Sequence, residues 1–158
     1  YSTLNELTEV IEELINDLEG TVHIIGHSLG GLITTNIANR NPEKIKNIIL
    51  IGSPINGSET AKKTMRFPGA IAMSGQILKD LIGGVEMKRN NIGVVSAFTN
   101  GIHKSALLKD INDGVVALKE TIPNYPHDHF MIEEQHTNVV KNSRVIERCH
   151  HFLEKNYF

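Results

Sequence analysis

The segment from Thr21 to Thr35, TVHIIGHSLGGLITT, constrains the fold more than any other part of the chain. A short run rich in β-branched residues ends at a glycine, and a second apolar pattern begins directly after it. The first run is typical of a buried β-strand, and the second has the spacing of a helix. The glycine-rich turn between them therefore predicts a strand that passes directly into a helix.

Strands and helices alternate along the rest of the chain. Short apolar runs predict strands at 21–25, 46–51, 92–98 and 127–132. Amphipathic spacing predicts helices at 4–18, 29–39, 70–82, 102–108 and 142–153. The first helix begins with the capping-box pair Thr3 and Glu6, and Gly20 is its expected stop. This alternation predicts an α/β fold, in which helices cover both faces of a parallel sheet.

Composition and charge narrow the class of protein. The 158 residues fit one domain, and the formal net charge of -2 gives no reason to expect nucleic acid or an anionic membrane as a partner. No apolar run approaches the roughly 18 residues of a membrane span. The single cysteine, Cys149, excludes an internal disulfide framework, and we expect a cytoplasmic protein. The alternation loosens only at 55–91, which we interpret as a small cap-like excursion.

Ser28 lies in the turn of the opening segment, within Gly26-His27-Ser28-Leu29-Gly30. Gly-x-Ser-x-Gly between a strand and a helix is the pattern of a nucleophile elbow, in which a sharp turn presents the serine. We expect positions 26 and 30 to require glycine, because side chains at these two positions would clash across the turn. The backbone N–H of Leu29 is then one donor of an oxyanion hole. One alternative is a glycine-rich turn in which the serine has no catalytic role. A phosphate-binding loop is a second alternative, but this stretch lacks the glycine and lysine pattern of such loops.

The stretch GHSLGGLI after VHII, followed by IILIGSPINGS, resembles the lipase and esterase branch of the α/β-hydrolase fold family. The resemblance implies a three-layer fold around a parallel sheet. It implies a serine hydrolase that cleaves a carboxylic ester through an acyl-enzyme, with no cofactor and no metal. Esters rank above amides and thioesters through this resemblance alone. The family's chain order is serine, acid, histidine.

Asp113, in INDGVVAL, matches the family's position for the acid, in a turn after the third predicted strand. A carboxylate there would orient the imidazole that takes the serine proton. Asp-Gly also favours turns for conformational reasons alone, so a purely structural aspartate is the alternative. Asp110 is the nearest competitor for the acid, and Asp80 is a weaker one.

His136, in EEQHTNVVKN, matches the base, because it follows the last predicted strand and precedes the final helix. His129 is the rival, but it lies within that strand, where its side chain is less free to reach Ser28. We interpret His23 as a packed core residue and His27 as a residue that shapes the pocket. His127 and His129 share a strand face and could bind a metal, but the spacing suggests no third ligand.

The resemblance also implies a second oxyanion donor, in a loop upstream of the elbow. Only one predicted helix precedes the elbow strand here, and the family's early strands are not in the sequence. We therefore expect a fold that lacks the N-terminal strands, as in the C-terminal portion of a longer hydrolase. The alternatives are a partner chain on the exposed sheet edge, as in an oligomer, or a reduced variant of the fold.

The excursion at 55–91 suits either of two roles. Met65, Phe67 and Met73 could line a pocket for the acyl chain of a small-molecule or lipid ester, since methionine adapts to irregular apolar shapes. They could equally fill the core of a small cap. Two functions other than ester hydrolysis stay open: an inactive hydrolase-fold binding module, and an acyltransferase with the same three residues.

Overall fold

Four parallel strands form the centre of the structure, a computed structural model that describes residues 3–67, 69, 75–100 and 104–158. In chain order its elements are α1 (Leu4–Asn16), β1 (Val22–His27), α2 (Leu29–Arg40), β2 (Ile45–Ile51), α3 (Glu59–Thr64), α5 (Ile77–Gly83), β3 (Ile92–Phe98), α6 (Leu118–Thr121), β4 (Asp128–Glu133), the 3₁₀ turn η2 (Val139–Lys141) and α7 (Ser143–Lys155). The strands lie side by side in the order β1-β2-β3-β4, and each neighbouring pair is parallel. The expected α/β fold is therefore confirmed.

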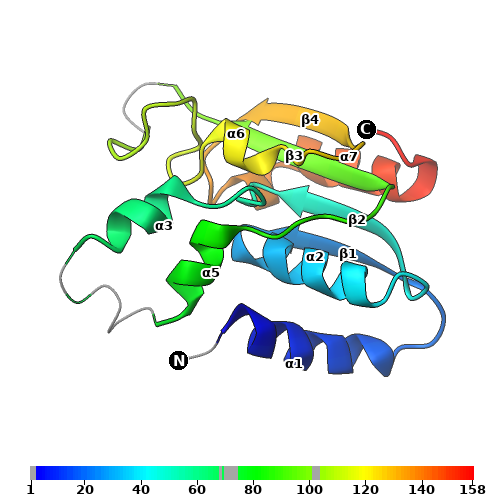
Figure 1. Cartoon of the computed structure of the whole chain (residues 1–158). Coiled ribbons are helices and arrows are strands. Elements are labelled where there is room, and N and C mark those ends of the chain that lie inside the picture. The colour runs from blue at the N-terminus through cyan, green and yellow to red at the C-terminus, as the bar shows by residue number, and fades with distance from the viewer. Residues whose placement is uncertain (1–2, 68, 70–74, 101–103) are drawn as a thin grey trace.

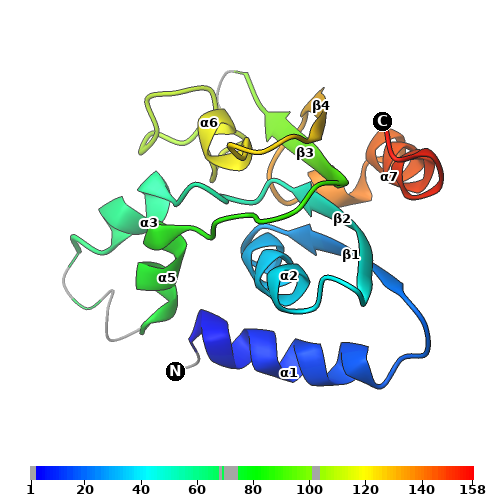
Figure 2. The same ribbon diagram turned by 45° about the vertical axis from the view of Figure 1, so that its right-hand side comes forward.

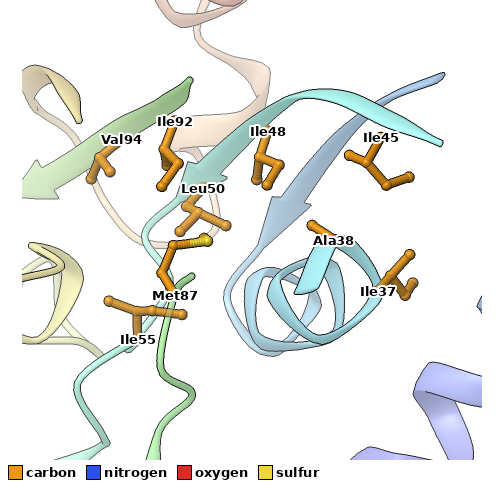
Figure 3. Close-up of a cluster of buried hydrophobic side chains, with 9 residues drawn as sticks. All are labelled: Ile37, Ala38, Ile45, Ile48, Leu50, Ile55, Met87, Ile92 and Val94. Atoms are coloured by element: carbon orange, nitrogen blue, oxygen red, sulfur yellow. The ribbon is translucent and has the colours of Figure 1, made fainter. Parts of the chain in front are cut away.

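The sheet separates two apolar cores. In both views α2 lies on one side of the sheet and α7 on the other (Figures 1 and 2). Successive residues of β2 point to opposite faces, so Ile48 and Leu50 pack toward α2, whereas Ile49 and Ile51 pack toward α7. Figure 3 shows the α2 side, where nine side chains form one cluster: Ile37, Ala38, Ile45, Ile48, Leu50, Ile55, Met87, Ile92 and Val94.

Most predicted elements are confirmed with small shifts at their ends. The third strand matches residue for residue. The capping box at α1 is formed: Thr3 Oγ1 accepts the Glu6 N–H at 3.1 Å, and the Glu6 carboxylate accepts the Thr3 N–H at 2.7 Å. The final helix starts one residue later than predicted, because the side chain of Asn142 accepts the Arg144 N–H and acts as its N-cap.

Two predicted helices differ from the structure. Of the helix predicted at 102–108, the described part is a turn, in which the Leu108 N–H donates to the Ser105 carbonyl at 3.2 Å. The Asn112 side chain accepts the Ser105 N–H at 3.0 Å. This side-chain hydrogen bond competes with the backbone hydrogen bonds that a helix would form here. Of the helix predicted at 70–82, residues 70–74 lie outside the described part, and α5 begins only at Ile77. The short helices α3 and α6 were not predicted.

β1 forms one edge of the sheet, and among the described strands it pairs only with β2. Ile25, on this strand, is 47% exposed and lines a cavity on the α7 side of the sheet. On the other side α1 packs on α2 and exposes Val10 and Leu14. The prediction that His23 is a core residue is wrong, since a side chain on an edge strand is less covered, and His23 is exposed. None of the described helices is both long and apolar enough to cross a membrane.

Phe152, on α7, tests the core beneath β3. Its side chain is 1% exposed and packs with the cluster on the α7 side. We expect Phe152→Ala to lower the free energy of unfolding by about 3–5 kcal/mol. Ile146 lies on the same helix but is 51% exposed. Ile146→Ala should therefore change the free energy of unfolding by less than about 0.5 kcal/mol. Urea unfolding followed by circular dichroism measures both; equal losses would contradict this placement of the core.

Candidate active site

Ser28 occupies a strained turn between β1 and α2. Its backbone has φ 53° and ψ -124°, a region that residues other than glycine rarely adopt. Such a conformation costs about 1–3 kcal/mol and persists only where the surroundings enforce it. The Ser28 N–H donates to the Ile51 carbonyl at 3.0 Å, and its carbonyl accepts the Gly31 N–H at 3.0 Å. The turn is thus fixed to both β2 and α2.

The glycines around Ser28 have unequal roles. A Cβ on Gly26 would lie 2.5 Å from the Gly30 carbonyl oxygen and 2.5 Å from Thr34 Oγ1, so Gly26 must lack a side chain, as predicted. The same expectation is wrong for Gly30, because a Cβ there points into open space. The close approach is instead at Gly31, where a Cβ would lie 2.0 Å from Ser53 Oγ.

His136 lies beside Ser28, as the sequence predicts for a base. Its Nε2 is 3.0 Å from Ser28 Oγ, and its Nδ1 is 2.7 Å from Asp113 Oδ2. A carboxylate can only accept, so Nδ1 carries the proton in this contact and Nε2 is left to accept the Ser28 hydroxyl. The His136 side chain is buried. The three residues therefore form a continuous hydrogen-bonded chain from hydroxyl to carboxylate.

Asp113 is held by its own turn. Oδ1 accepts the backbone N–H groups of Val115 at 3.0 Å and Val116 at 2.8 Å, which leaves Oδ2 for His136. The side chain of Asn112 fixes the same turn by accepting the Gly114 N–H at 3.0 Å. Burial of a carboxylate is costly unless hydrogen bonds replace water, and here three donors do so. Asp113 therefore lies in a turn after the third strand, as predicted.

A backbone hydrogen bond joins the loop of Asp113 to the loop of His136. The His136 N–H donates to the Asp113 carbonyl at 2.9 Å, so the two loops are bonded through main chain as well as side chain. Gly52 follows β2 directly, has φ +53°, and lies next to the Asp113 and His136 side chains. A Cβ on Gly52 would approach Asp113 Oδ2 and His136 Nδ1 to 3.4 Å each. Gly52 is a residue of this site that was not predicted from the sequence, although it directly follows a predicted buried strand.

The first helix of the excursion braces the acid loop. Thr60, on α3, donates its hydroxyl to the Val115 carbonyl at 2.5 Å. The buried Glu120 carboxylate accepts the Glu59 N–H at 2.7 Å and the Ala117 N–H at 2.9 Å. Burial raises the pKa of Glu120, and the two backbone donors oppose that rise. These contacts give α3 a structural role beside Asp113.

The pocket residues predicted in the excursion fall into different surroundings. Met65 is half-buried at the end of α3, and Phe67 is 60% exposed. Met73 lies outside the described residues. Met87 is 1% exposed and belongs to the core cluster on the α2 side, so this methionine fills the interior. Both views place α3 and α5 beyond the carboxyl ends of the strands, the edge on which Ser28 lies (Figures 1 and 2).

The competing residues lie in other contacts. Asp110 pairs with Lys119 at 2.5 Å, and Asp80 accepts the Leu4 N–H at 2.8 Å. His129 Nε2 is 2.8 Å from Ser96 Oγ, on β3, and burial lowers its pKa. The rings of His127 and His129 are 5.8 Å apart, but no cluster of three metal-binding side chains occurs in the described part of the chain.

Comparison with known proteins shows the family to which the chain belongs. Residues 1–91 match the profile of the alpha/beta hydrolase fold. The chain belongs to the α/β-hydrolase fold family. It is 33% identical over 84 residues to the biotin biosynthesis bifunctional protein BioHC of Teredinibacter turnerae, covering 51% of this chain and 14% of that protein. It is 31% identical over 68 residues to a probable mitochondrial phospholipase of Saccharomyces cerevisiae, covering 40% of this chain and 10% of that protein. The chain thus spans a small part of either relative.

Solved structures of esterases and lipases share the fold of this hydrolase-family chain. A metagenomic carboxyl esterase superposes with a TM-score of 0.67 at 17% identity, covering 87% of this chain and 52% of that one. A lipase from Bacillus licheniformis superposes with a TM-score of 0.66 at 15% identity, covering 98% of this chain and 73% of that one. At such identities the likeness establishes the fold.

Gly30 and Gly31 allow a matched test of the elbow. We expect Gly31→Ala to lower the free energy of unfolding by about 1–3 kcal/mol, because its Cβ would overlap Ser53. Gly30→Ala places the same methyl group in open space on the same helix, and should change it by less than about 1 kcal/mol. Urea unfolding measures both. A greater loss in the Gly30 variant would contradict the contacts described at this turn.

Proposed function

We propose that this protein is a serine hydrolase that cleaves carboxylic esters. The observation that carries the proposal is the hydrogen-bonded chain from Ser28 Oγ through the His136 ring to Asp113 Oδ2, with contacts of 3.0 and 2.7 Å. A serine hydroxyl is a weak nucleophile at neutral pH unless a base takes its proton, and a carboxylate keeps that base in the correct tautomer. The contacts of His136 with Ser28 and with Asp113 support these two roles.

The proposed reaction has two stages. Ser28 Oγ attacks the ester carbonyl while its proton passes to His136 Nε2, and Asp113 stabilises the imidazolium. His136 then returns the proton to the leaving alcohol, and the acyl group stays on Ser28. In the second stage His136 takes a proton from water, the hydroxyl attacks the acyl carbonyl, and the proton returns to Ser28 as the acid leaves. No cofactor or metal takes part in this scheme.

Leu29 is the proposed donor to the oxyanion. It is the first residue of α2, and the N–H groups of the first helical turn have no acceptor within the helix. The positive end of the helix dipole adds to the stabilisation of negative charge at this position. Loss of one such donor typically lowers kcat by about 10²–10³-fold. A second donor is part of the proposal, and the family resemblance implies that it comes from a loop upstream of the elbow.

The choice of an ester substrate is supported by the relatives. The two solved structures named above are a carboxyl esterase and a lipase, and one of the curated relatives is a probable phospholipase. We propose a small-molecule or lipid ester on this basis. We also propose that the edge of β1, which pairs only with β2 among the described strands, is covered in the functional protein by a further strand or a second copy.

Asp113→Asn tests the role of the acid. The two N–H donors at Oδ1 should hold the amide oxygen, so the amide nitrogen would face His136 and force its proton onto Nε2. Nε2 could then not accept from Ser28. We expect kcat for 4-nitrophenyl esters to fall by about 10⁴-fold with KM little changed. Asp110→Asn, in the exposed pair with Lys119, is the matched control and should retain full activity. Undiminished kcat in the Asp113 variant would exclude this mechanism.

Ser28→Ala separates the proposal from its two alternatives. A fluorophosphonate probe should label the native chain and leave the variant unlabelled, because labelling requires an activated serine. A native chain that folds but resists the probe would indicate an inactive binding module. If the probe labels Ser28 but added alcohol diverts most of the acyl group from water, as seen in the product ratio, the protein is an acyltransferase.

A further inference from the structure

His27, the residue before Ser28, makes a direct contact with the base. Its Nε2 is 2.9 Å from the backbone carbonyl oxygen of His136, and the centroids of the two rings are 4.8 Å apart. A carbonyl oxygen only accepts, so His27 Nε2 carries the proton in this hydrogen bond. From its place in the elbow, His27 was predicted to shape the pocket; its contact with the His136 backbone is a different role.

The surroundings of His27 favour its neutral form. The ring lines a cavity of about 400 Å³ on the α7 side of the sheet, together with Ile51, Cys149 and Leu153. Burial lowers the pKa of His27 below its ordinary value of 6.5, and the nearby charge of His136 lowers it further. The hydrogen bond to the carbonyl and the charge of Asp113 oppose this shift. A neutral ring adds no positive charge beside the imidazolium that forms on His136 during catalysis.

We propose that His27 is a positioning residue that sets the distance between Ser28 and His136. It is bonded covalently to Ser28 on one side, and its side chain holds the backbone of His136 on the other. The His136 N–H is already bound by the Asp113 carbonyl at 2.9 Å, so this hydrogen bond fixes the remaining polar group of the same peptide segment. The inference rests on the proposed function, because it concerns the geometry of that same hydroxyl and base.

The replacement of His27 by glutamine or methionine isolates the hydrogen bond. The two side chains have similar length, but only the glutamine amide can donate to the His136 carbonyl. Misplacement of a catalytic group by about 1 Å can cost on the order of 10²-fold in rate. We therefore expect His27→Met to lower kcat by about 10–100-fold with KM changed by less than about threefold, and His27→Gln to restore most of the loss. His23→Met, on an exposed residue of the same strand, should have no effect.

A second measurement does not require hydrolysis. The proton between His136 Nδ1 and Asp113 should give a low-field NMR signal, which Asp113→Asn would identify by its loss. We expect this signal in the native chain and in His27→Gln, and broadening by exchange with water in His27→Met. His27→Leu provides a second variant without a donor if the methionine variant does not fold.

The outcomes separate the inference from the proposed function. If the native chain hydrolyses no ester and resists the fluorophosphonate probe, the proposed function fails, but the NMR comparison still decides whether His27 holds the base. Native kcat and an unchanged signal in His27→Met would overturn the positioning role. An equal loss in His27→Gln and His27→Met would overturn it as well, because the hydrogen bond would then not be the cause.

Discussion

The parallel arrangement of the sheet is the constraint on which the candidate site depends. In a parallel sheet all strands end at the same edge, so the segments that follow them meet there. Ser28 follows β1, Gly52 follows β2, Asp113 comes in the loop after β3, and His136 follows β4. These residues are far apart in the sequence, but the strand order places them at one edge. The apolar cores on both faces stabilise this arrangement.

Within that frame, main-chain hydrogen bonds do most of the local positioning. Asp113 keeps one oxygen for His136 because backbone donors occupy the other. The excursion contributes through two residues of α3: the Thr60 hydroxyl donates to the Val115 carbonyl of the same loop, and the Glu59 N–H donates to Glu120, on the α6 side of that loop. The segment that could, from its sequence, line a substrate pocket thus also helps to hold the Asp113 loop. Substitutions in α3 are therefore expected to disturb the position of the Asp113 loop directly, rather than through a contact with a ligand.

The sequence predicted those features that depend on local pattern. Gly26-His27-Ser28 at a strand–helix junction indicated the elbow, and the positions of Asp113 and His136 relative to their strands followed from the family's chain order. Contacts between segments that are distant in the chain could not be predicted from these local patterns. The close approach of Gly31 to Ser53, which leaves no room for a Cβ, and the exposure of His23 on the edge strand depend on which segments become neighbours in the fold. The short helices α3 and α6 contain too few turns for an amphipathic period to be recognised.

The site also forms a closed ring of contacts, which has a consequence for its energetics. Ser28 is joined to His27 by a peptide bond, His27 to the His136 carbonyl by one hydrogen bond, and the His136 ring back to Ser28 by another. In a closed ring each contact limits the freedom of the others, so part of the entropic cost of holding the hydroxyl against the base is met on folding. Residues coupled in this way have non-additive effects. After His27 loses its donor, the loss of the Asp113 contact should therefore cost less than it does in the native chain.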